Sequence, residues 1–255
     1  MNYLRSFLSA LGMFTAVPMP QLDWDMEHGS RMTACFGLTG AVLGALYLLL
    51  AWIFSFLPIP GLIFSVLLLA AVYALTGFLH LDGFMDVCDA LLSHRDEEGR
   101  RRILKDPHCG SFAVICLFFL LAANLASVSV LRSAPAGPIV WAVLFVCAPT
   151  LSRCAAGLLL LCVRTMPESS LGAYFKTGNG PRVKLVLAIT ALAALAALLL
   201  FAGFPCTAAL AGGTLLGTLL GLYATRRLGG INGDVSGFTV VLSETLSLLL
   251  LTAVF

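Results

Sequence analysis

Apolar residues dominate this chain in seven long runs, and polar residues are confined to the stretches between them. The runs cover 34–57, 59–80, 111–131, 138–163, 184–203, 206–224 and 238–255. Each is close to or above the roughly 20 residues that an α-helix needs to cross a bilayer. The pattern therefore predicts an all-α, polytopic membrane bundle with about seven spanning helices.

A shorter amphipathic stretch precedes the first run. Its large apolar residues recur at helical spacing: Leu4, Phe7, Leu8, Leu11 and Phe14. The stretch is too short to span a bilayer, so we expect 1–33 to be an N-terminal interfacial segment whose helix lies on the membrane surface. In the sixth run, Gly213, Gly217 and Gly221 repeat every four residues and predict close helix packing.

The composition supports a membrane location. The chain has 255 residues, of which 60% are hydrophobic and only 11% charged, whereas a soluble domain is about a quarter charged. We therefore expect 1–255 to form one integral membrane domain. Its eight cysteines show neither a CxxC pair nor zinc-ligand spacing, so we expect neither disulfides nor a zinc site.

The charges fall almost entirely on one side of the predicted bundle. Of the 15 Lys and Arg residues, all but Arg132 and Arg153 lie in the N-terminal segment, in 81–110, 164–183 or 225–237, or at a span edge. Because Lys and Arg concentrate on the cytoplasmic side of the inner membrane, we expect that side to be cytoplasmic. The acids gather there too, which indicates a polar working surface with 81–110 as a cytoplasmic active-site loop.

Three aspartates follow the second run at offsets of four and seven residues: Asp82, Asp86 and Asp89. This spacing puts them within about 60° on one helical face. Like charges four residues apart destabilise a helix unless something neutralises them. Oxygen ligands without a His or Cys partner favour Mg²⁺ or Mn²⁺. We therefore predict a metal site, and a solvated acidic face is the alternative.

Basic residues follow these acids on the same membrane side. Arg102 and Lys105, the latter directly before Asp106, suit a diphosphate substrate, whose charge a metal ion and basic side chains share. For Arg100 and Arg101, anchoring to anionic lipid headgroups explains the sequence equally well.

A glycine-rich turn precedes the last run. Gly230, Gly233 and Asp234 lie in it, and glycines before a helix start let backbone N–H groups approach a phosphate, although a plain turn is an equally good explanation. Arg153 and Glu244 interrupt apolar runs. Because ionisable residues in spans face a partner or a polar cavity, these two are expected to pair or to flank one cavity.

Five stretches of the sequence resemble the signature blocks of the cobalamin synthase family, the adenosylcobinamide-GDP ribazoletransferases. They are "FTAVPMP", "HGSRMTACFGLTGAVLG", "GFLHLDGFMDVCDALL", "ILKDPHCGSF" and "LGGINGDVSGFTVVLSE". They occur in the family's order and cover most of the chain. The resemblance implies an inner-membrane enzyme of the last steps of coenzyme B12 assembly. Such an enzyme joins adenosylcobinamide-GDP to α-ribazole or its 5′-phosphate, releases GMP and requires Mg²⁺.

Residues at matching positions take their expected roles from this resemblance and from the patterns above. The candidate metal ligands are Asp82, Asp86, Asp89, Asp234 and Glu244. The candidate catalytic residues are His80, Asp82, Asp86, Lys105 and Asp106. The candidate substrate-binding residues are Arg31, Arg102, Arg153, Lys176, Gly230, Gly233 and Asp234. For His80, proton acceptance from the attacking hydroxyl and a structural hydrogen bond both stay open. Asp234 either completes the metal site or orients the nucleotide.

The chain departs from the family pattern at several positions, among them Asn232, where Thr is usual, and Ser170, where Gly is usual. The second change leaves open whether the 164–180 loop is a flap over the site or a simple connector. None of the departures removes a candidate carboxylate ligand.

Two other functions fit parts of the pattern less well. A CDP-alcohol phosphotransferase also clusters aspartates at a membrane interface, but its motif is not matched, because Gly83 directly follows Asp82 and no Ala-Arg pair follows. A cation or organic-ion transporter should have polar residues deep in several spans, whereas only Arg153 is clearly deep. We expect the lipid bilayer as environment and no nucleic acid partner, and the sequence leaves homo-oligomerisation open.

Overall fold

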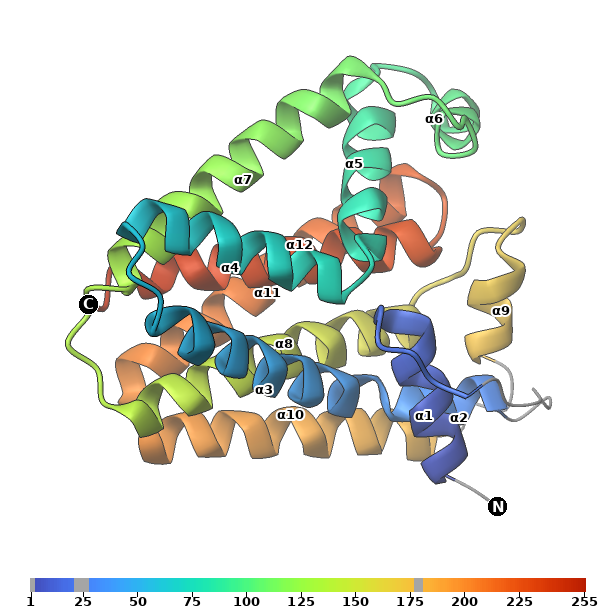
Figure 1. Cartoon of the computed structure of the whole chain (residues 1–255). Helices are drawn as coiled ribbons and strands as arrows, with labels where there is room; N and C mark the ends of the chain where they lie inside the picture. Colours follow the sequence, from blue (N-terminus) through green and yellow to red (C-terminus); the bar gives the residue numbers. More distant parts are fainter. Residues whose placement is uncertain (1–2, 21–27, 177–180) are drawn as a thin grey trace.

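The structure, a computed structural model, describes residues 3–20, 28–176 and 181–255 (Figure 1). Its helices are α1 Tyr3–Phe14, α2 His28–Ala34, α3 Phe36–Ser55, α4 Gly61–Leu75, α5 Leu79–Leu92, α6 Glu97–Ile103, α7 Ser111–Leu131, α8 Pro138–Cys162, α9 Ser170–Lys176, α10 Pro181–Phe201, α11 Gly203–Arg227 and α12 Gly233–Leu251. Within these ranges the only β-type pairing is an isolated bridge. The predicted all-α class is confirmed.

In the part of the chain that the structure describes, six helices are long and apolar enough to cross a membrane: α3, α7, α8, α10, α11 and α12. A seventh candidate is the pair α4 and α5, which passes the same test together but is bent by 92°. The prediction of about seven spans is confirmed. Helices α8 and α12 are the most buried, with 67% and 56% of their apolar windows inside the protein. They therefore form the centre of the bundle.

The second predicted span is not straight. Helix α4 ends at Leu75, and the chain then turns through Gly77 and Phe78, whose φ angles are +60° and +59°. A non-glycine residue with positive φ is uncommon, and hydropathy gives no sign of such a break. The prediction of one continuous span over 59–80 was therefore wrong. The predicted loop 81–110 is also largely helical, since it holds most of α5 and all of α6.

One end of the bundle carries the short helices. Figure 1 shows α1, α2, α5, α6 and α9 at this end, while the turns that lead into α4 and α8 lie at the other. The sequence had grouped the same segments on one side by charge. A helix is present where the N-terminal one was predicted, as α1, in which Tyr3 and Leu4 are 63% and 68% exposed and Leu11 is buried. Its position at the membrane surface stays a prediction. The rest of the 1–33 prediction includes residues 21–27, which lie outside the described residues.

Glycines bring α11 and α12 into close contact, as their spacing predicted. A Cβ added at Gly213 or Gly217 would overlap Ser247 or Ser243, and one at Gly221 would overlap Thr239. Small residues permit this close approach of spanning helices. The contact fixes the position of α12, whose first turn carries Asp234.

Candidate active site

Helix α5 lies across the start of α12, and its three aspartates lie on another face of α5 than its buried apolar residues. Its inward face carries Phe84 and Val87, which are 4% and 0% exposed, and Phe84 stacks on Phe238 of α12 with ring centroids 5.8 Å apart. The helical period then leaves Asp82 exposed and Asp86 partly buried. The predicted common face of these aspartates is present.

Asp234 joins these residues because Gly83 has no side chain. A Cβ at Gly83 would lie 2.8 Å from Asp234 Cα and 2.9 Å from its carbonyl oxygen, so any other residue would push α5 and α12 apart. The negative charges of Asp82, Asp234 and Asp89 all act on Asp86. We call these four residues the acidic cluster. Two signature blocks that are about 150 positions apart in the sequence thus meet at one place.

The third aspartate of α5 packs against the start of another helix. Gly110 directly precedes α7, and a Cβ there would overlap the carboxylate of Asp89. The "KDPHCG" segment therefore ends against the acidic cluster. Within this segment, the backbone N–H and imidazole of His108 lie 3.0 and 2.7 Å from Asp106 Oδ1, and these contacts lower the pKa of Asp106.

The first turn of α12 holds Asp234 through Asn232. The Asn232 side chain accepts a hydrogen bond from Val235 N at 3.0 Å and donates one to Asp234 Oδ2 at 2.6 Å. It is an effective N-cap, so this departure from the family pattern keeps the helix start intact. At Gly233 a Cβ would meet no atom within 4 Å, so the helix start is open toward an approaching anion, as phosphate binding requires.

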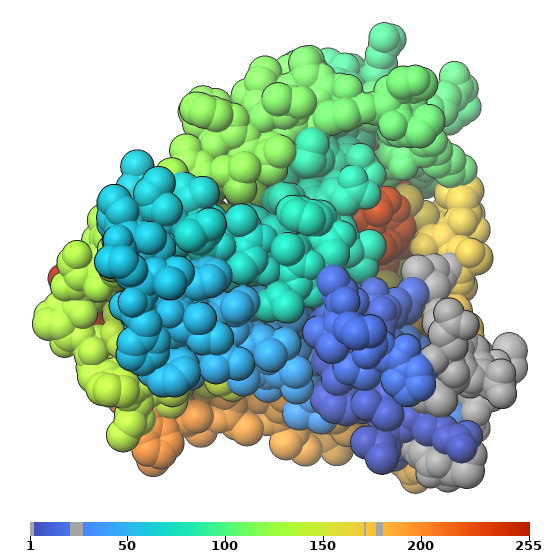
Figure 2. Space-filling view, viewed as in Figure 1, coloured from blue at the N-terminus to red at the C-terminus, as the bar shows by residue number. Residues whose placement is uncertain are grey.

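Gly230 has a packing role in the same turn. A Cβ there would lie 2.6 Å from Met166 N, and Gly230 N donates to Thr225 O at 2.9 Å. Next to it, Ile231 pairs with the chain after α8, through Met166 N to Ile231 O and Ile231 N to Arg164 O, both 2.9 Å. Figure 2 shows this turn, in red, reaching the surface between α5 and α9.

Two arginines of α6 hold the end of α11, a role that the sequence analysis missed. Arg100 donates to Arg227 O at 3.2 Å, and Arg101 Nε donates to Leu228 O at 2.9 Å. Arg101 also pairs with Glu97 at 2.6 Å. Carbonyls at a helix C-terminus lack intrahelical partners, and basic side chains satisfy them. Arg100 is 8% exposed, which does not suit the headgroup anchoring considered for it.

The remaining basic candidates lie around this end of the bundle. Arg102 is exposed and pairs with Glu98 at 2.5 Å, and Lys105 is exposed nearby. Lys176 donates to the carbonyl of Val163 just after α8, and burial, followed by the charge of Lys184, lowers its pKa. Arg31 is partly buried on α2. Of these, Arg102 and Lys105 are exposed to solvent, and the charge of Arg102 is already paired with Glu98.

His80 lies behind the acidic cluster, not on its surface. It is 6% exposed, and the rings of Phe14 and Phe36 lie 6.4 and 6.3 Å from its own. A Cβ at Gly237 of α12 would come within 3.1 Å of its Cα. Because a general base must reach the proton that it accepts, this burial argues against His80 as the base. Its Nδ1 is buried and has no hydrogen-bond partner among the described residues, so the structure does not support the alternative of a structural hydrogen bond either.

Arg153 and Glu244 form an ion pair inside the bundle, and the prediction that they pair is confirmed. Arg153 Nη1 lies 2.5 Å from Glu244 Oε1, and Ser152 Oγ donates to the same oxygen at 2.9 Å. Glu244 follows Asp234 by ten positions on α12, which corresponds to about 15 Å of helix. The structure therefore separates Glu244 from the acidic cluster, and it does not support Glu244 as a ligand of the same metal ion.

The acidic cluster has the donor chemistry for Mg²⁺. Among the residues that the structure describes, no three His, Cys, Asp or Glu side chains converge on one point. Mg²⁺ does not require such a cage, because it is usually held by one or two carboxylates together with substrate phosphates and water. The four aspartates supply the hard oxygen ligands that it prefers.

Fold and site together define a polytopic membrane protein with an acidic cluster at one end of its helix bundle. The model of the cobalamin-5-phosphate synthase family matches residues 6–252. The chain belongs to this family.

Similar proteins cover nearly the whole length of the chain. An adenosylcobinamide-GDP ribazoletransferase of Clostridium perfringens is 36% identical over 98% of both chains. One of Halorubrum lacusprofundi is 34% identical, over 96% of this chain and 95% of its own. One of Geobacillus kaustophilus is 31% identical, over 94% and 92%. No solved structure matches the chain.

Proposed function

We propose that this protein joins adenosylcobinamide-GDP to α-ribazole, or to its 5′-phosphate, and releases GMP. The product is adenosylcobalamin or its 5′-phosphate. The observation that carries the proposal is the acidic cluster, which two family blocks build at a polar end of the bundle, beside an open helix start. Family membership supplies the substrate class, and the cluster suits a reaction at a diphosphate.

The reaction is an in-line phosphoryl transfer. The ribazole hydroxyl oxygen attacks the phosphorus attached to cobinamide, and the bond from that phosphorus to the GMP oxygen breaks. We assign Mg²⁺ binding to Asp82, Asp86, Asp89 and Asp234. When bound, this ion neutralises diphosphate charge. We assign acceptance of the hydroxyl proton to Asp82, because it is exposed whereas His80 is buried.

Other groups bind the phosphates. The exposed charge of Lys105 is available to phosphate oxygens, and Arg102 would exchange its exposed partner Glu98 for a phosphate oxygen. The N–H groups of the first turn of α12 offer hydrogen bonds to an anion. The spanning helices hold this surface in place, so that water-soluble substrates meet at the membrane.

Turnover by the purified protein tests this proposal. With adenosylcobinamide-GDP and α-ribazole, GMP is expected to appear only in the presence of Mg²⁺, and chelation should stop its release. CDP-diacylglycerol with an alcohol acceptor serves as the control substrate pair and should yield no CMP. If no GMP is released at saturating concentrations of both substrates and of Mg²⁺, the assigned reaction is refuted. Turnover that persists after chelation would refute the metal assignment alone.

We also propose that the acidic cluster lies on the cytoplasmic side of the inner membrane. The distribution of Lys and Arg supports this orientation. In a chain with the exposed Cys109 and Cys162 replaced by Ser, an impermeant maleimide added to intact cells should label Ser133→Cys. It should label Ser93→Cys only after the cells are permeabilised. The opposite pattern would invert the topology.

A further inference from the structure

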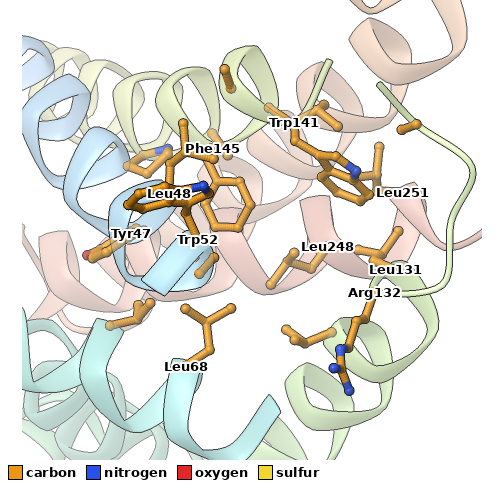
Figure 3. Close-up of a pocket in the computed structure, with 18 of the residues that line it drawn as sticks. Tyr47, Leu48, Trp52, Leu68, Leu131, Arg132, Trp141, Phe145, Leu248 and Leu251 are labelled. Carbon is orange, nitrogen blue, oxygen red and sulfur yellow. The ribbon is translucent and has the colours of Figure 1, made fainter. Parts of the chain in front are cut away.

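A large apolar cavity opens away from the acidic cluster. It has a volume of about 1050 Å³ and lies between α3, α4, α7, α8 and α12 (Figure 3). Its walls are mainly aromatic and aliphatic, and they include Tyr47, Trp52, Leu68, Trp141, Phe145 and Leu248. Ser55 at the end of α3 and Pro138 at the start of α8 also line it. The cavity therefore reaches the end of the bundle opposite α5.

Water is a poor occupant for this space. This cavity is open on one side, and its lining is almost wholly apolar. Even a much smaller, enclosed apolar cavity of about 150 Å³ stays dry and takes up small apolar molecules instead. If the cavity were empty, the residues that line it would lack dispersion contacts on the side that faces the cavity. A chain-like apolar group matches a lining of this size and composition.

The cavity carries one basic group where it meets the end of the bundle. Among the described residues that line it, Arg132 is the only base. Its guanidinium lies 4.6 Å from the centroid of the Phe64 ring, and the described residues place no acid within ion-pair distance of it. Arg132 is also one of only two Lys or Arg residues away from the polar end. A phosphate group would complement this charge.

Tryptophans mark the same region. Trp52 and Trp141 both line the cavity, and Figure 3 shows Trp141 and Arg132 along the same side of it. Tryptophan is enriched at the level of lipid headgroups. At the inner end, the Glu244 carboxylate is paired with Arg153, so its charge is compensated and does not oppose an apolar chain. The cavity thus combines a headgroup-like end with an apolar interior.

We propose that this cavity binds a glycerophospholipid, with its phosphate at Arg132 and an acyl chain between α3, α4 and α8. The ligand belongs to the leaflet on the side away from the acidic cluster. The site is distinct from the substrate surface, and its test does not depend on the reaction proposed above.

Native mass spectrometry tests the proposal on full-length protein supplied with palmitoyl-oleoyl phosphatidylglycerol. The unmodified chain should retain one phospholipid through delipidation in mild detergent. Ala142→Phe, which adds a ring to the cavity wall, should lose it. Arg132→Gln should weaken binding at least about tenfold, since it removes one charge-assisted contact, and Arg132→Lys should retain most of it. The matched control Arg226→Gln, in the last turn of α11, should behave as the unmodified chain.

Two results would overturn the inference. The first is full retention of the lipid by both Ala142→Phe and Arg132→Gln. The second is a dimer without lipid that Ala142→Phe dissociates, because a second copy of the chain would then occupy the cavity. Thermal unfolding of each variant shows whether it is folded before binding is compared.

Discussion

Replacing Asp82, Asp86 or Asp89 by Asn is expected to lower Mg²⁺-dependent GMP release at least about 100-fold. Removal of a single group that stabilises charge in a transition state typically has an effect of this size. Asn keeps the shape of Asp but removes the charge that would hold the ion. Because the acidic cluster is built from side chains at the bundle end, the variants should still insert and purify like the unmodified chain. Steady-state turnover of the purified variants measures the loss.

Asp96→Asn is the matched control for this series. It makes the same chemical change on the same side, but Asp96 is the N-cap of α6, where its side chain accepts from Gly99 N at 2.9 Å. Asn caps helices as well as Asp does, so turnover should be unchanged. Unimpaired turnover in all three cluster variants would remove the metal assignment.

Breaking the ion pair between Arg153 and Glu244 should cause the largest loss of stability. Glu244→Gln leaves the guanidinium of Arg153, which is 1% exposed, without its countercharge. Removal of one partner from a buried pair costs about 3–5 kcal/mol. The unfolding temperature of the detergent-solubilised protein should fall accordingly, and Arg153→Met should also lower it.

The double variant Arg153→Met with Glu244→Gln separates pairing from simple packing loss. Its loss of stability should be smaller than the sum of the losses in the two single variants, because neither charge is then left without a partner. Strictly additive losses would show that the two residues stabilise the bundle independently. GMP release by the double variant, once folded, would also show that Glu244 is dispensable as a metal ligand.

The sequence predicted the acidic cluster well because helical spacing is a local property. The offsets between Asp82, Asp86 and Asp89 determine a common face wherever the helix lies. The partnership with Asp234 followed only from family blocks, since the contact through Gly83 joins distant parts of the chain. The pair of Arg153 with Glu244 could be expected because charges in apolar runs need a partner.

Other features depend on geometry that composition does not encode. Hydropathy sums apolar residues and so joined α4 to the start of α5, although the positive φ angles at Gly77 and Phe78 turn the chain there. Arg100 and Arg101 looked like any basic run beside a membrane. Their role as caps follows from where α11 ends in space, and α6 could not be placed there from the sequence.

The contact between Gly83 and the backbone of Asp234 also bears on how the protein is made. Translation delivers α5 well before α12, so the acidic cluster stays incomplete until α12 has been inserted and packed. A nascent or prematurely terminated chain lacks both one carboxylate and the surface on which α5 rests. Activity therefore requires α12, and a truncation before Gly233 would yield an inactive product however well its earlier spans insert.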